Sequence, residues 1–139
     1  MYVLDTNVIS ELRSGKAQQS KAVREWAAAQ PGNELYLSAI TVMEMQIGAQ
    51  LMERRDAAQG RILRSWNEKV FAEFEGRVLS FSEQTAMFCA PLHVPHKKSF
   101  RDSMIAAAAL EHRFTVVTRN VGDFKMAGLK VANPWEHTA

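Results

Sequence analysis

The sequence has 139 residues, a length that suits one domain with a single core and leaves little room for a second. Its 17 Lys and Arg against 15 Asp and Glu give a formal net charge of +2, too small to indicate nucleic-acid binding by overall charge, so a polyanionic partner would need a local patch. The one cysteine, Cys89, excludes an internal disulfide, and we find neither a leader nor an apolar run of membrane-spanning length. We therefore expect a soluble, cytoplasmic protein with one domain over residues 1–139.

The chain begins with a short apolar run, residues 2–4, that ends at Asp5. Thr6 and Asn7 follow, with side-chain oxygens that suit a helix N-terminus, so we expect a helix to begin near Val8. A buried strand that leads directly into a helix places its turn at the carboxyl edge of a parallel sheet, where open α/β folds bind their ligands. The pattern therefore predicts that Asp5 points into a cleft.

The middle of the chain predicts a strand at residues 34–38 and a helical hairpin over residues 40–75, with a bend at Asp56. A further helix is expected at residues 22–30. The first helix of the hairpin is indicated by apolar residues at helical spacing: Ile40, Met43, Ile47 and Leu51. The second has an expected buried stripe of Ile62, Leu63, Trp66, Val70, Phe71 and Phe74. Because the hairpin would protrude from the sheet, it offers a surface for a dimer or a partner.

The last part of the chain continues the alternation of strands and helices. We expect strands at residues 77–81, 114–118 and 129–131, and helices at residues 82–92 and 100–112. Strands that alternate with helices favour an α/β fold with a parallel sheet covered by helices on both faces.

Four acidic residues share a predicted location at the carboxyl edge of this sheet. Asp5 ends the first strand, Glu44 and Asp102 lie near the starts of helices, and Asp123 follows the strand at 114–118. Carboxylates a few ångström apart oppose each other's ionisation, so the cluster implies a compensating cation. We find no lysine or arginine at a matching core position, and this favours a divalent cation that prefers oxygen ligands, Mg²⁺ or Mn²⁺.

Such an ion, held by carboxylates, binds phosphate oxygens and activates water, so the reaction class indicated is phosphodiester hydrolysis. Thr118 and Asn120 lie beside the acids in the sequence and are predicted to orient them. Simpler roles stay open: the helix dipole favours acids such as Glu44 and Asp102, and Asp123 lies in a segment rich in turn residues.

Four segments resemble the signature segments of PIN-domain ribonucleases: LDTNVIS at 4–10, LSAITVME at 37–44, DSMIAA at 102–107 and TRNVGDF at 118–124. Their order and spacing, with NPW at 133–135, are similar to the VapC toxins, especially the FitB-like branch. The resemblance implies a three-layer α/β/α sandwich with a mainly parallel sheet of order 3-2-1-4-5. It also implies an Mg²⁺- or Mn²⁺-dependent endoribonuclease that hydrolyses RNA with a metal-activated water.

The resemblance further implies the toxin of a type II toxin–antitoxin pair that forms a homodimer. A cognate antitoxin would wrap the toxin and press a side chain, often arginine, into the acid pocket of a larger assembly. By position, the catalytic acids and metal ligands would be Asp5, Glu44, Asp102 and Asp123, with Thr118 or Asn120 assisting.

Residues 93–101 match no pattern of the family that we can identify. The cations Lys97, Lys98, Arg101 and Arg119 suit either an RNA path or a solvated surface, and His93 and His96 are more typical of ordinary surface histidines. Two other functions stay open: a non-catalytic PIN scaffold that binds RNA or protein, and a metal-dependent nuclease that acts on DNA.

Overall fold

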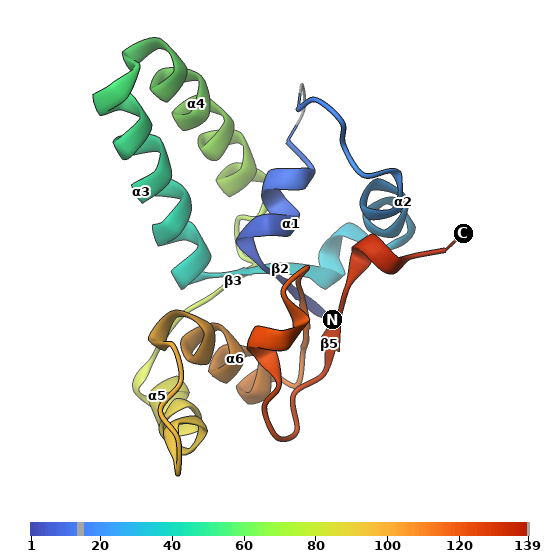
Figure 1. The fold of residues 1–139 in the computed structure, drawn as a ribbon, viewed down its shortest axis with the longest axis vertical. Helices are drawn as coiled ribbons and strands as arrows, with labels where there is room; N and C mark the ends of the chain where they lie inside the picture. The colour runs from blue at the N-terminus through green and yellow to red at the C-terminus, as the bar shows by residue number, and fades with distance from the viewer. Residues whose placement is uncertain (14–15, 139) are drawn as a thin grey trace.

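The computed structural model describes residues 1–13 and 16–138 and contains a five-stranded sheet (Figure 1). The strands are β1 Tyr2–Leu4, β2 Leu35–Ser38, β3 Val78–Leu79, β4 Thr115–Val117 and β5 Val131–Ala132. Their order is β3-β2-β1-β4-β5 and every neighbouring pair is parallel, which confirms the fold predicted from the sequence. Strand β1 is central, so Asp5 follows the middle strand of the sheet.

The helices agree closely with the predicted ranges. They are α1 Thr6–Glu11, α2 Lys21–Ala29, α3 Ala39–Arg55, α4 Ala57–Glu73, α5 Glu83–Cys89 and α6 Phe100–His112. Short 3-10 helices cover Gly32–Glu34, Ala90–His93, Val121–Phe124 and Pro134–Glu136. None of the helices in the part of the chain that is described is long and apolar enough to cross a membrane.

Successive residues of the central strand face opposite sides of the sheet and belong to two cores. Leu4 packs with Val8, Trp26 and Phe74 in the core under α1, α2 and the α3–α4 hairpin. Val3 packs instead with Ile105 and other residues of α6, which presents the small side chains Ala106, Ala108 and Ala109 to the sheet. Layers of helices on both faces therefore hold β1 in place (Figure 1).

Helix starts along the carboxyl edge are fixed by short polar side chains. Asp5, and not Thr6 or Asn7, is the N-cap of α1, and its carboxylate accepts a hydrogen bond of 2.8 Å from the Thr6 amide. The helix therefore begins earlier than the predicted start near Val8. Ser38 caps α3 in the same way and accepts from the Ile40 amide at 3.0 Å.

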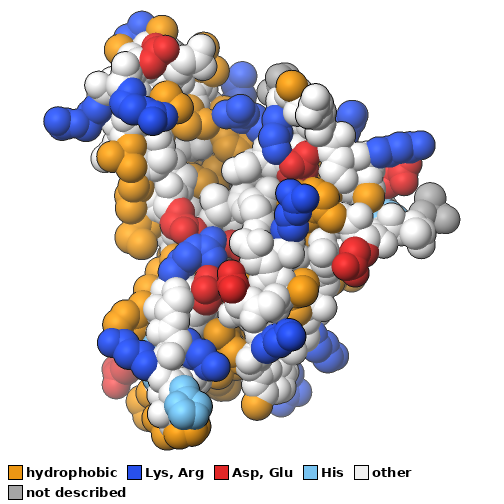
Figure 2. All heavy atoms as spheres, viewed as in Figure 1, with side chains coloured by type: hydrophobic (Ala, Val, Ile, Leu, Met, Phe, Trp, Pro, Cys, Tyr) orange, Lys and Arg blue, Asp and Glu red, His pale blue; other side chains and the backbone are white. Residues whose placement is uncertain are grey.

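Most of the apolar residues that indicate the first helix of the hairpin lie outside the core. Met43, Ile47 and Leu51 are 49, 48 and 60% exposed, whereas the buried residues of α3 include Met45 and Ala49. Apolar residues lie on both sides of α3, so a spacing of four residues does not show which side faces α4 and the core. Ile62 of α4 is exposed as well, whereas Val70 and Phe74 are buried as expected. Figure 2 shows the resulting band of hydrophobic atoms along the outer side of the hairpin.

Glu11, at the end of α1, is buried and holds the segment that follows the helix. Its carboxylate accepts from the Lys16 ammonium at 2.6 Å and from the Ser20 amide at 2.8 Å. These hydrogen bonds, that of Lys16 first, lower the pKa of Glu11 below its ordinary value of 4.5. A lowered pKa in the folded state means that the ionised group stabilises the fold above pH 4.5, and that this contribution is lost as the pH falls through the lowered pKa.

We therefore expect Glu11→Gln to be less stable than the parent protein at pH 7, with the difference shrinking progressively below pH 4.5. The measurement is the free energy of unfolding in urea of both proteins between pH 7 and pH 3. Glu25→Gln is the control, because its pair with Lys21 is 3.6 Å long and lies on the surface, where such pairs contribute little. A gap between Glu11→Gln and the parent that stays constant with pH would contradict this prediction.

Candidate active site

Asp5 is fully buried at the end of β1, and both of its carboxylate oxygens have partners inside the protein. Oδ1 accepts from the Thr6 amide at 2.8 Å, and Oδ2 accepts from the Thr118 hydroxyl at 2.7 Å and, more weakly, from the Asn7 amide at 3.4 Å. These hydrogen bonds fix the orientation of the Asp5 side chain. The acid predicted at the end of the first strand is therefore held in a fixed orientation inside the protein.

Thr6 connects Asp5 to a second acid. Its hydroxyl donates to Glu44 Oε1 at 2.7 Å, and Glu44 lies near the start of α3. The residues that begin α1 and α3 thus meet at the carboxyl edge of β1 and β2, as neighbouring parallel strands require.

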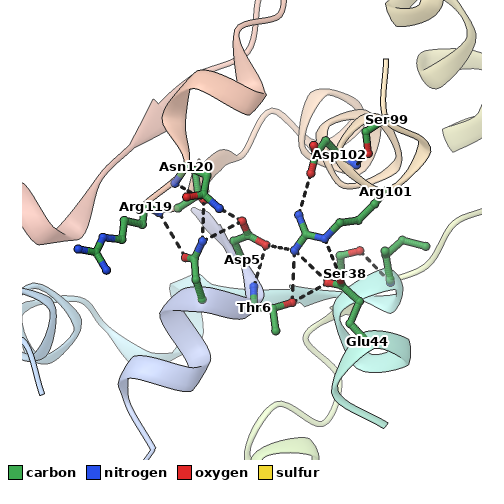
Figure 3. A network of polar contacts seen from close by, with 12 residues as sticks. Asp5, Thr6, Ser38, Glu44, Ser99, Arg101, Asp102, Arg119 and Asn120 are labelled. Carbon is green, nitrogen blue, oxygen red and sulfur yellow. Dashed lines mark hydrogen bonds and ion pairs between the residues drawn. The ribbon is translucent and has the colours of Figure 1, made fainter. Parts of the chain in front are cut away.

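A guanidinium group lies between three of the predicted acids (Figure 3). Arg101 Nη2 is 2.5 Å from Asp5 Oδ1, Nε is 2.6 Å from Glu44 Oε2, and Nη1 is 2.7 Å from Asp102 Oδ1. Nη2 also donates to Glu44 Oε1 at 2.9 Å, so Glu44 is held by two nitrogens of the planar fork. We call the group formed by Asp5, Glu44, Arg101 and Asp102 the acid–arginine cluster.

The cluster corrects the expectation that no cation of the chain itself accompanies the acids. Burial alone would lower the pKa of Arg101, but the hydrogen bonds that it donates to Glu44 and Asp5 outweigh this effect and raise the pKa. The guanidinium thus stays charged, and it offsets part of the repulsion between the three carboxylates. Three negative charges against one positive charge leave the cluster with an excess of negative charge.

Thr118 and Asn120 occupy a tight polar turn after β4. The Thr118 hydroxyl is buried, donates to Asp5 and accepts from the Asn120 amide at 3.0 Å. The contact of Asn120 with this turn is thus through its backbone. The neighbouring Arg119 points away from the cluster in Figure 3, and its guanidinium lies over the Trp135 ring at 5.1 Å.

Asp123 lies in the 3-10 helix Val121–Phe124 and is exposed. Within residues 1–13 and 16–138, its carboxylate forms no hydrogen bond or ion pair with the acid–arginine cluster. Over the same residues, no three acidic, histidine or cysteine side chains are arranged closely enough to hold a metal ion as they stand. The structure therefore brings together three of the four predicted acids, spaced around the arginine.

The other cations and histidines of residues 93–101 lie outside the cluster. The Lys97 ammonium is 4.8 Å from the centre of the Phe100 ring, and His93 Nε2 is 2.8 Å from the Ser103 hydroxyl. His93 Nδ1 accepts from the Lys98 amide at 3.1 Å, so this histidine fastens the loop to the start of α6. From the sequence, Arg101 was considered only for an RNA path or a solvated surface, and its place among the acids was not predicted. The available signal was its place next to Asp102 in the first turn of a helix that begins at the same edge as Asp5.

The fold and the arrangement of acids define a class of protein. A model of the PIN domain matches residues 2–128, and the chain belongs to this family. Within it, the chain is 42% identical to the VapC ribonuclease Y4jK of Sinorhizobium fredii, over 98% of this chain and 99% of the relative. It is 36% identical to the toxin FitB of Neisseria gonorrhoeae over 97% and 99% of the two chains.

Solved structures agree with these relatives. A chain of the crystal structure of FitAcB from Neisseria gonorrhoeae has a TM-score of 0.87 and 36% identity, and the match covers 98% of this chain and 99% of that one. A chain of FitAB bound to an IR36 DNA fragment has a TM-score of 0.88, 34% identity and coverage of 100% and 99%. The assignment to the VapC and FitB group of PIN domains is thus confirmed.

Proposed function

We propose that this chain is a metal-dependent endoribonuclease and the toxin of a toxin–antitoxin pair, with residues 1–139 acting as one nuclease domain. The observation that carries the proposal is that Asp5, Glu44 and Asp102 surround the guanidinium of Arg101 at the carboxyl edge of the sheet. The names of the relatives support the reaction, since one is a VapC ribonuclease and another is a toxin.

The donor set suits Mg²⁺ or Mn²⁺. Asp5, Glu44 and Asp102 present only carboxylate oxygens, the ligands that these ions prefer, and their excess negative charge calls for a further cation. We infer that these residues hold the ion, with Asp123 approaching from the turn after β4. When bound, the ion supplies Lewis acidity toward a phosphate oxygen and toward water.

The protein's own groups orient the site. Thr118 and the Thr6 amide hold the two oxygens of Asp5, and the Thr6 hydroxyl holds Glu44. Both acids are therefore already oriented before substrate binds. Asn120 contributes by fixing the Thr118 hydroxyl. Carboxylates that are already oriented cost little reorganisation during the reaction, which is the main contribution of a rigid site to catalysis.

The test is cleavage of total RNA by the purified protein in Mg²⁺ or Mn²⁺, with EDTA in a parallel sample. We expect internal cleavage that EDTA abolishes. Matched RNA and DNA oligonucleotides separate an RNA nuclease from a DNA nuclease. Binding of RNA without cleavage in either metal would favour the non-catalytic scaffold instead.

A groove between the α3–α4 hairpin and Arg13 supports the proposal of an antitoxin partner. The groove has a volume of about 910 Å³, and Figure 2 shows a hollow with hydrophobic atoms there. Its lining combines apolar side chains with basic ones and contains no acidic residue: Arg13, Met52, Ala58, Gln59, Arg61, Ile62, Leu63, Ser65, Trp66 and Lys69. This chemistry favours an amphipathic, acidic segment of the antitoxin.

We therefore expect the double variant Arg61→Glu, Lys69→Glu to bind the antitoxin about ten-fold more weakly, because reversed rim charges slow association and add repulsion. Surface plasmon resonance at two salt concentrations measures this effect. The charge-matched control is Arg24→Glu, Lys130→Glu, since both residues are exposed and lie outside the groove. Equal weakening by the two double variants would contradict the groove as the docking site.

We also propose a homodimer. The exposed residues Met43, Ile47 and Leu51 form an apolar stripe along α3, separate from the residues that line the groove. A second copy of the chain would bury this stripe. Light scattering of the purified protein tests this state.

A further inference from the structure

The guanidinium of Arg101 contacts the carboxylate oxygens that a metal ion would bind. All three kinds of nitrogen in its guanidinium are engaged, and they contact Asp5 Oδ1, both oxygens of Glu44, and Asp102 Oδ1. These are the oxygens that the proposed ion needs. An Mg²⁺ ion binds oxygen at about 2.0–2.1 Å, shorter than any of these nitrogen–oxygen distances, so the ion and the guanidinium cannot occupy the middle of the cluster together.

The carboxylates would remain oriented if Arg101 left. Asp5 keeps its hydrogen bonds from Thr118 and Thr6, and Glu44 keeps that from the Thr6 hydroxyl. The acids around the arginine are too widely arranged to hold an ion as they stand, which indicates that a small adjustment accompanies the exchange.

Arg101 also has a route out of the cluster. Its side chain is 33% exposed, whereas Asp5 beneath it is fully buried. Arg101 belongs to the first turn of α6, at the surface where side chains of both signs gather between α3 and α6 (Figure 2). A change of rotamer at the end of this long side chain needs no change of the backbone.

We propose that Arg101 is an internal counterion that occupies the metal position, so that a divalent ion binds only when this side chain is displaced. Without the ion, Arg101 offsets repulsion between the acids and stabilises the fold. With the ion, its guanidinium is released toward the surface. The fraction of molecules with Arg101 displaced then limits the apparent metal affinity, because only these molecules can bind. The inference rests on the proposed metal-dependent function.

The test is a titration of the purified full-length protein with Mn²⁺, followed by the loss of the free-ion signal in electron paramagnetic resonance. Arg101→Gln is expected to bind Mn²⁺ about ten-fold or more tightly than the parent protein, since it removes the competing charge. In EDTA the variant should melt at a lower temperature than the parent, and saturating Mn²⁺ should raise its melting temperature by more. Arg119→Gln is the matched control, because that guanidinium lies over Trp135 outside the cluster.

A second variant and a structure with bound Mn²⁺ test the same displacement of Arg101. Arg101→Lys retains the charge but lacks the planar fork, so it covers the case in which Arg101→Gln does not fold, and its Mn²⁺ affinity should exceed that of the parent. A crystal structure of the parent with Mn²⁺ should show the guanidinium away from Asp5 and Glu44. Equal or weaker Mn²⁺ binding by folded Arg101 variants, or a bound ion with Arg101 still in place, would overturn the proposal.

Mn²⁺ binding and RNA cleavage, measured together, separate the counterion role of Arg101 from the nuclease activity. If the parent protein and the variants bind Mn²⁺ equally and all cleave RNA, the counterion role is wrong and the nuclease stands. If neither the parent nor the variants bind Mn²⁺, both the counterion role and the proposed metal dependence are wrong.

Discussion

Replacing Asp5 by asparagine is expected to lower the rate of RNA cleavage by roughly 10²–10³-fold, the loss typical of removing one group that stabilises charge in the transition state. Asp5 is the most constrained acid of the site: it is fully buried and contacts Thr6, Thr118 and Arg101. A neutral amide in its place would offer the ion one weak oxygen ligand in place of an anionic carboxylate. Rates with labelled RNA at saturating Mg²⁺ measure the effect.

The fold should survive this substitution, because asparagine is as good an N-cap as aspartate and can still accept from the Thr6 amide. Asp56→Asn provides a matched control. Asp56 is also a helix N-cap, accepting from the Gln59 amide at 3.1 Å, but it caps α4, far along the hairpin. Cleavage by Asp56→Asn should equal that of the parent. If folded Asp5→Asn cleaves RNA at the parent rate, Asp5 is not part of the catalytic site.

Replacing Gly60 by alanine is expected to destabilise the protein by about 1–3 kcal/mol, the usual cost of adding a methyl group where no space exists. Gly60 is buried where α4 crosses α3, and a Cβ atom there would lie 2.5 Å from the Cα of Glu53. Because the obstacle is backbone, a change of side-chain rotamer cannot relieve it, and the two helices of the hairpin must separate. Urea denaturation measures the loss.

Gly48 offers the opposite case within the same hairpin. It is exposed on α3, and a Cβ atom there would meet nothing within 4 Å. Gly48→Ala should therefore stabilise the protein by about 0.5–1 kcal/mol, since alanine favours a helix over glycine. A Gly60→Ala protein as stable as Gly48→Ala would show that the helices are not in close contact at this crossing.

The sheet and its helices were predictable from the sequence because their signals are local. An apolar run that ends at Asp5, and a β-branched run before Thr118, identify strands without reference to the rest of the chain. The alternation of strands and helices then implies a parallel sheet, which places Asp5, Glu44 and Asp102 at one edge.

Two features were not predictable because they depend on tertiary contacts. The side of α3 that is buried is set by where α4 crosses it, so Met43 is exposed although it fits an apolar spacing. The place of Arg101 depends on the distance between α3 and α6, which only the folded chain fixes. The resemblance could not supply it either, since residues 93–101 match no family pattern that we identified.

The central position of β1 makes the geometry of the candidate site depend on residues far apart in the sequence. Strand β1 pairs with β4, and Asp5 depends on the hydroxyl of Thr118, which lies near the other end of the chain. A ribosome must therefore translate most of the message before the first residues acquire their final neighbours. A nascent chain that still lacks β4 therefore lacks the hydrogen bond from Thr118 that orients Asp5 in the proposed nuclease.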